Sequence, residues 1–214
     1  MMPLKAEKSN HMKYYWIAIL AIAVWGCSGE PKEKNLPILG FHDINGQDTV
    51  YHAIPDFSFV NQDSNVINNA TFEGKAYIVD FFFTSCPTIC PKVTQQMLRI
   101  HDRYKEDNRL LLLSHTIDTK RDTVERLKSY ADKIKVNAEK WHFVTGDKDK
   151  IYNIAEDYMS IAIENPDAPG GFDHSDWLIL IDKDRHIRSY CDGTNEDAVT
   201  EFMTDIDWLL DHSF

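Results

Sequence analysis

The chain lacks an apolar run long enough to cross a membrane as a helix, which takes about 20 residues. Its most apolar segment, Tyr14 to Trp25, is shorter than that and follows Lys13. A short apolar core behind a basic residue is typical of a signal peptide. The 214 residues also contain no internal repeat and no low-complexity tract. These absences favour one domain that follows an export signal.

The end of the apolar segment resembles the cleavage site of bacterial lipoproteins. Val24-Trp25-Gly26-Cys27 supplies the small residue and the cysteine of that motif, with a tryptophan where a small or aliphatic residue is usual. We predict a lipoprotein signal peptide over residues 1–26, acylation of Cys27 and a tether over residues 27–50. The alternative is an uncleaved short anchor. Both place the domain of residues 51–214 outside the cytoplasm, and the lipid anchor favours the periplasmic face of the inner membrane.

Positive charge is also scarce. The chain has 23 Lys and Arg residues against 34 Asp and Glu, a net charge of −11 at pH 7. Proteins that bind nucleic acid need clustered cations to neutralise phosphates, so we expect no nucleic-acid partner. An acidic surface suits a basic partner or a cation, and an ordinary solvated surface explains it equally well.

Cysteine is scarce as well, with four in the chain. If Cys27 carries lipid, then Cys86, Cys90 and Cys191 remain. An odd number outside the cytoplasm indicates a redox pair and one single thiol. A domain of this size buries a hydrophobic core large enough to be stable without disulfide bonds, which argues against a disulfide framework. Cys191 lies at the end of a predicted strand, and we expect it to be incidental.

The remaining pattern predicts an α/β fold. The segment from Ala76 to Phe83, rich in aromatic and β-branched residues, indicates a buried central strand. Asp122 is the expected N-cap of a helix. Further strands are predicted at 110–117, 141–144, 177–181 and 186–190, helices at 91–104, 123–134, 148–158 and 197–210, and an N-terminal edge hairpin at 54–60 and 66–67. This order fits a thioredoxin-like fold with a central mixed sheet flanked by helices.

Two cysteines stand where the central strand gives way to a helix. In Cys86-Pro87-Thr88-Ile89-Cys90 they are four residues apart, one helical turn. Three hypotheses compete. A disulfide with a purely structural role is disfavoured. Closing so short a loop removes little entropy from the unfolded chain and therefore stabilises the fold only slightly. Thiol–disulfide exchange is possible, although thioredoxin-type enzymes have two intervening residues rather than three. Metal binding is the third, since two thiolates favour Cu(I) or Zn.

A metal site needs a third ligand, and His174 is the candidate. It lies in Gly170-Gly171-Phe172-Asp173-His174, just before the strand predicted at 177–181. In a thioredoxin-like fold this position faces the cysteine turn. A histidine among glycines and acids is otherwise usually a surface residue, and the other eight histidines show no metal-ligand spacing.

Three segments together resemble the SCO/SenC family. They are Phe83 to Pro91, Thr116 to Thr123, and Asp173-His174-Ser175, in this order. The resemblance extends over roughly residues 53 to 210. It differs at Thr119, where the family often has proline.

The resemblance implies a membrane-tethered copper-binding protein with a thioredoxin-like fold. Such proteins assist assembly of the CuA centre in subunit II of cytochrome c oxidase, by delivering copper, by reducing the target cysteines, or both. Carried over by position, Cys86, Cys90 and His174 are ligands of one copper ion, as Cu(I), Cu(II) or both. Asp118 corresponds to an acidic residue beside the site.

Two alternatives to copper handling stay open. The protein could be a thiol–disulfide oxidoreductase in which Cys86 and Cys90 are the catalytic pair and no metal is needed. It could also be a redox or copper sensor that signals through an unnamed partner. The expected partner of the copper-handling protein is subunit II of cytochrome c oxidase or another copper or thiol protein. The sequence leaves open whether the protein is an enzyme.

Overall fold

Three adjacent parallel strands form the centre of the structure, a computed structural model that describes residues 35–45 and 48–214. These strands are β5 (Ala76–Phe82), β6 (Leu110–Thr116) and β7 (Trp141–Thr145). Every residue of β5 and β6 is buried. Strands that are covered on both faces read as near-continuous apolar runs, which is why this part of the sheet could be predicted.

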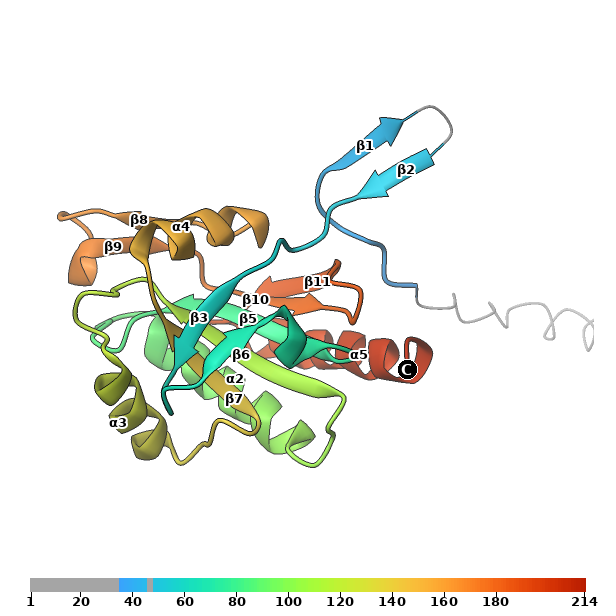
Figure 1. The fold of residues 1–214 in the computed structure, drawn as a ribbon. Coiled ribbons are helices and arrows are strands. Elements are labelled where there is room, and N and C mark those ends of the chain that lie inside the picture. The colour runs from blue at the N-terminus through green and yellow to red at the C-terminus, as the bar shows by residue number, and fades with distance from the viewer. Residues whose placement is uncertain (1–34, 46–47) are drawn as a thin grey trace, which may run out of the picture. The chain divides into compact units, whose positions relative to one another are not determined.

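Antiparallel strands extend this centre into a seven-stranded sheet in the order β11-β10-β5-β6-β7-β3-β4 (Figure 1). The predicted edge hairpin is β3 paired with β4, and it does lie at one edge of the sheet. A second, two-stranded sheet pairs β8 with β9. The bounds of the strands not yet given are β3 Ser58–Asn61, β4 Val66–Asn68, β8 Ala162–Glu164, β9 Phe172–His174, β10 Trp177–Ile181 and β11 Ile187–Asp192.

Helices cover both faces of the seven-stranded sheet (Figure 1). On one face, the ring of Tyr130 packs against Phe82 of β5 and Phe143 of β7, and its hydroxyl lies 2.8 Å from Thr94 Oγ1. On the other face, Phe81 packs against Tyr158. The helices are α2 Cys90–Tyr104, α3 Val124–Ile134 and α5 Glu196–His212 on the first face, α4 Lys148–Asp157 on the second, and the short 3-10 turns η1 Asn69–Phe72 and η2 Pro169–Gly171. The predicted α/β class with a mixed central sheet is confirmed.

A hairpin that the sequence did not predict lies almost wholly within residues 27–50, the range expected to be a tether. It pairs β1 (His42–Asn45) with β2 (Asp48–Tyr51). Its strands are too short to show a reliable alternation. The predicted signal peptide and Cys27 lie outside the described residues. Among the described residues, no helix is long and apolar enough to cross a membrane.

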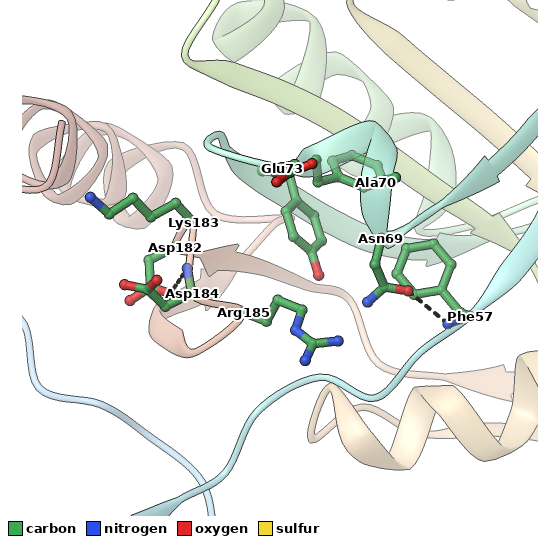
Figure 2. Close-up of a pocket in the computed structure, with 10 residues that line it drawn as sticks. Phe57, Asn69, Ala70, Glu73, Asp182, Lys183, Asp184 and Arg185 are labelled. Carbon is green, nitrogen blue, oxygen red and sulfur yellow. Dashed lines mark hydrogen bonds between the residues drawn. The ribbon is translucent and has the colours of Figure 1, made fainter.

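A hollow of about 390 Å³ lies between η1 and the turn that joins β10 to β11 (Figure 2). Two of the polar side chains that line it are bound within the protein: Asn69 Oδ1 accepts from the backbone N–H of Phe57, and Asp182 Oδ1 accepts from that of Asp184. No cysteine lines this hollow.

His115 is a buried histidine without a hydrogen bond to any described residue. His115 is the last residue but one of β6, its side chain is fully buried, and neither ring nitrogen finds a partner. Rings of Phe59 and Phe81 lie 5.2 Å from it, and those of Phe57 and Tyr158 about as close. Burial lowers the pKa of His115 to about 3. The ring is therefore neutral in the folded protein.

This burial predicts acid sensitivity. Unfolding releases a histidine of ordinary pKa, so the unfolded state binds the extra proton and stability is lost as pH falls from about 6.5 towards 3. Between neutral pH and pH 4 we expect the wild type to lose on the order of 3 kcal/mol more than His115→Phe. Urea unfolding at both pH values measures the difference. His212→Phe, at the exposed end of α5, is the matched control, and equal losses in wild type and His115→Phe would contradict the prediction.

Candidate metal centre

Cys86 and Cys90 lie on the turn that leads from β5 into α2. Cys90 is the first residue of the helix, and Pro91 follows it at a position where a missing N–H costs nothing. Ile89 at the N-cap has no capping side chain, so the partial positive charge of the helix start is not masked by one. Both thiols are free, Cys90 buried and Cys86 partly exposed. The turn therefore presents two sulfurs at a position that favours thiolate.

A buried carboxylate fixes the start of this turn. Asp122 Oδ2 accepts hydrogen bonds from Thr84 N at 2.9 Å and Thr116 Oγ1 at 2.6 Å, and Oδ1 accepts from Thr84 Oγ1. Arg126 pairs with the same carboxylate at 3.3 Å. The prediction that Asp122 caps α3 is wrong, because its oxygens are taken by these donors. Thr123 is the N-cap, and its hydroxyl accepts from the N–H of Arg126.

His174 reaches the turn from the small β8–β9 sheet. It is the last residue of β9, paired with Ala162 of β8, whereas the sequence predicted a loop there. Its ring packs edge-on against Phe83 at 5.8 Å. Gly170 has φ +84°, and a Cβ atom at this position would lie 2.7 Å from the Phe83 ring. The glycine therefore allows the segment before β9 to approach the end of β5 closely.

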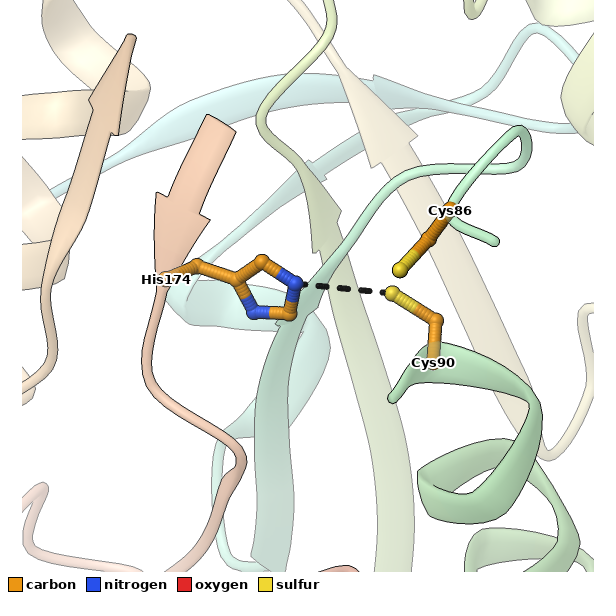
Figure 3. A group of neighbouring side chains, drawn as sticks. All are labelled: Cys86, Cys90 and His174. Atoms are coloured by element: carbon orange, nitrogen blue, oxygen red, sulfur yellow. Dashed lines mark hydrogen bonds between the residues drawn. The ribbon is translucent and has the colours of Figure 1, made fainter. Parts of the chain in front are cut away.

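The three side chains converge (Figure 3). Their ligand atoms, two Sγ and one imidazole nitrogen, all lie within 4.8 Å of one another, with Cys90 Sγ 3.5 Å from His174 Nε2. His174 Nδ1 lies 2.9 Å from the carbonyl oxygen of Ser175, which can only accept. Nδ1 therefore carries the proton, and in the neutral ring Nε2 directs its lone pair at the sulfurs. Such a second hydrogen bond is usual for metal-ligating histidines.

This donor set fits a single copper ion. The two thiolate sulfurs are soft ligands, imidazole is a common copper ligand, and a set of three such donors suits Cu(I). Within the part of the chain that the structure describes, no other group of three His, Cys, Asp or Glu side chains comes together in this way.

Comparison with known proteins gives the family. The family model described as SCO1/SenC matches residues 45–211. The chain belongs to the SCO1/SenC family. The resemblance found in the sequence is thereby confirmed.

Relatives from this family match about three quarters of the chain, and the solved structures among them share its fold. A SCO1 protein homolog of Bacillus subtilis (strain 168) is 24% identical over 162 residues, which cover 75% of this chain and 84% of that protein. The crystal structure of a SCO1/SenC family lipoprotein from Bacillus anthracis matches with a TM-score of 0.67 and 25% identity, over 74% of this chain and 95% of that one. Arabidopsis thaliana ScoI, solved with copper bound, has a TM-score of 0.61 and 24% identity, over 73% and 99%.

The two thiols of this SCO1/SenC site differ in acidity. The hydrogen bond from Cys90 is the main cause that lowers the pKa of Cys86, and the contact with His174 adds to it. The pKa of Cys90 is raised, first by the same bond and then by burial. Burial lowers the pKa of His174, but the interactions with Cys86, with the carbonyl of Ser175 and with the charge of Asp80 together outweigh this, and the net direction is upward. The partly exposed sulfur is therefore the thiolate.

The other two residues considered from the sequence lie outside the three-atom group. The buried carboxylate of Asp118 accepts from the backbone and side chain of Arg121, at 3.2 and 3.1 Å. Its role beside the site stays a prediction. Cys191 lies in β11 and is buried, which raises the pKa of its thiol to about 12. Its expected lack of function also stays a prediction.

Asp80 is a residue that the sequence analysis missed. It is the one acid within β5, 4% exposed, and it accepts a hydrogen bond from Ser114 Oγ, which in turn accepts from Trp141 Nε1 at 2.8 Å. Burial raises the pKa of Asp80 to about 6, while the charge of His174 acts against this. The only signal in the sequence was a single acid inside a strand expected to be fully buried.

Asp80 should cost stability at neutral pH. Because its folded pKa lies above the unfolded value, its favourable contribution is present below about pH 4 and is lost as pH rises through about 6. Asp80→Asn should therefore raise the free energy of unfolding at neutral pH by on the order of 3 kcal/mol and change it little at pH 4. Thermal unfolding at the two pH values measures this. Asp184→Asn, an exposed acid in the β10–β11 turn, is the control, and an equal gain at both pH values would count against the assignment.

Proposed function

We propose that the protein is a membrane-anchored, extracytoplasmic copper-binding protein that acts in assembly of the CuA centre of cytochrome c oxidase subunit II. The observation that carries the proposal is the convergence of Cys86 Sγ, Cys90 Sγ and His174 Nε2 within 4.8 Å. Membership in the SCO1/SenC family supports the oxidase as target, and the lipoprotein relative from Bacillus anthracis supports the anchor.

Copper is the cargo in this proposal, held by both sulfurs and by Nε2 of His174. The ligands bind as thiolates, so loading releases protons and affinity falls in acid. Of the two cysteines, Cys86 is partly exposed and Cys90 is buried, so the sulfur of Cys86 is the one that an incoming thiol reaches first. Three ligands leave coordination positions open, which allows an incoming sulfur to bind before the outgoing one leaves.

Thiol–disulfide exchange is a second function of the same atoms, favoured by the unequal acidity of the two thiols. The Cys86 thiolate would attack a target disulfide and release one target thiolate. The Cys90 thiol would then lose its proton and attack the sulfur of Cys86, which releases the second target thiol. The target gains two electrons and the protein ends as a Cys86–Cys90 disulfide.

Removal of the imidazole separates the two functions. His174→Ala should weaken Cu(I) binding by more than the roughly 10- to 100-fold that loss of a supporting residue costs. Competition with a chromophoric Cu(I) chelator measures this, with His212→Ala as the matched control. Oxidase activity in cells that carry the variant gives the second readout. If oxidase activity survives His174→Ala and is lost with Cys86→Ser, reduction is the function and copper delivery is not.

Oxidation should abolish copper binding, because both sulfurs are used in the disulfide. We expect one copper per chain in the reduced protein and none after formation of the Cys86–Cys90 disulfide, measured by elemental analysis with absorption spectroscopy. Cys191→Ala should leave both values unchanged. Equal copper content in the two redox states would show that the metal lies elsewhere.

A further inference from the structure

The chain on one side of the site is acidic over a long stretch. From Ile151 to Asp182 it contains seven Asp and Glu residues and no Lys or Arg. This stretch includes most of α4, the β8–β9 sheet with His174, and β10. Two of the acids are paired, Glu164 with Lys148 and Asp182 with Arg188. The other five have no ion pair with any described residue, and they are Glu156, Asp157, Asp167, Asp173 and Asp176.

Cations lie on the opposite side of the site, and Lys92 and Lys120 among them form no ion pair with a described residue. Arg121 and Arg126 lie there, and each is bound to a buried carboxylate, Asp118 at 3.1 Å and Asp122 at 3.3 Å. The field around the sulfurs is therefore asymmetric, with uncompensated negative charge on the side that carries His174.

Three exposed apolar side chains gather within the acidic side. Trp177 follows His174 by three residues, and its ring lies 4.3 Å from that of Tyr190 on β11. Both line a small hollow together with Met159, at the end of α4. The three residues, called the Trp177 patch from here on, are 38%, 46% and 50% exposed in the order Trp177, Tyr190, Met159. Large apolar side chains grouped on a surface mark sites of interaction.

Acids flank this patch directly. Glu156 and Asp157 precede Met159, and Asp192 lies opposite Trp177 in the β10–β11 register. The cation on β11, Arg188, is engaged by Asp182 and by the carbonyl oxygen of Leu36. An apolar centre with a negative surround is complementary to an apolar contact surrounded by Lys and Arg.

We propose that the Trp177 patch is the docking surface for the protein that exchanges copper or thiols with the site, and that this partner carries Lys and Arg around an apolar contact. This rests on the proposed function of the sulfurs. A second copy of the chain fits poorly, because two acidic surrounds would face each other. Anionic lipid fits poorly for the same reason.

Two synthetic disulfide peptides test the charge preference. Each carries one cystine beside a leucine, with the disulfide flanked by lysines in one and by glutamates in the other. The reduced full-length protein converts each peptide disulfide to two thiols as it forms the Cys86–Cys90 disulfide. We expect the lysine peptide to react about 10-fold faster or more at roughly 0.01 M salt, and the preference to vanish at about 1 M.

Variants locate the preference on the patch. Glu156→Gln with Asp192→Asn should reduce it, and Trp177→Ala or Tyr190→Ser should slow both peptides. The matched control is Glu106→Gln with Asp211→Asn, two exposed acids outside the acidic stretch, which should behave as wild type. A small uncharged disulfide gives the intrinsic reactivity of the dithiol, which should be the same in every variant.

Several results would overturn the docking surface. In the peptide experiment these are equal rates for the two peptides, no reaction with either, or a control variant that lowers the preference as much as the patch variant does. A dimer in sedimentation that depends on Trp177 would identify a second copy as the occupant. Binding to phosphatidylglycerol vesicles that depends on Trp177 would identify lipid. Copper stoichiometry of the same preparations reports separately on the proposed function. A normal copper content with no charge preference would reject the docking surface alone.

Discussion

The carboxylate of Asp122 holds the arrangement on which the site depends. It is fully buried and joins the end of β5 to the end of β6 through Thr84 and Thr116, with Arg126 as counter-ion. A buried carboxylate is tolerated only when its oxygens are satisfied, and removal of either side would leave charged or polar groups unpaired. Thr84, where the cysteine turn begins, is therefore fixed relative to the sheet. This also limits where Cys86 and Cys90, two and six residues later, can lie.

The second half of the site is held by packing rather than by charge. Phe83 contacts both Phe172 and His174, and Gly170 allows the chain to approach that ring. The carbonyl of Ser175 then fixes the proton on the far side of the imidazole. The buried acid Asp80 contributes a negative charge beneath the site. Because the charge of Asp80 lowers the stability of the fold at neutral pH, its presence in the core is consistent with a functional role.

The sequence predicted what depends on local pattern. The buried β5 and the apolar stripe of α2 placed Cys86 and Cys90 on one turn, because both signals lie within a few residues of the cysteines. His174 could be identified only through the predicted fold and the family resemblance. Nothing in its own segment of the sequence indicates a contact with Cys90, 84 positions away. The β8–β9 pair was missed because strands of three residues are too short for a periodic signal.

Misassigned polar residues show the other limit of sequence reasoning. Aspartate before a helix is a common cap, and Asp122 has the right position for it. Its carboxylate instead accepts hydrogen bonds from Thr84 and Thr116, which follow or end two neighbouring strands. The next residue, Thr123, is the N-cap of α3. Asp80 was overlooked because its six strand neighbours are apolar and dominate the pattern. Both acids acquire their roles from contacts distant in sequence.

The imidazole and the sulfurs are positioned by different sheets. Cys86 and Cys90 follow the core of the seven-stranded sheet, whereas His174 lies on a ladder of three residue pairs that is separate from it. Local opening of so short an element costs less free energy than global unfolding. Opening of the β8–β9 ladder would therefore separate the His174 ring from the two sulfurs without unfolding the seven-stranded sheet. Release of a bound ion would then proceed ligand by ligand, at a rate set by the opening of this ladder and not by the stability of the domain.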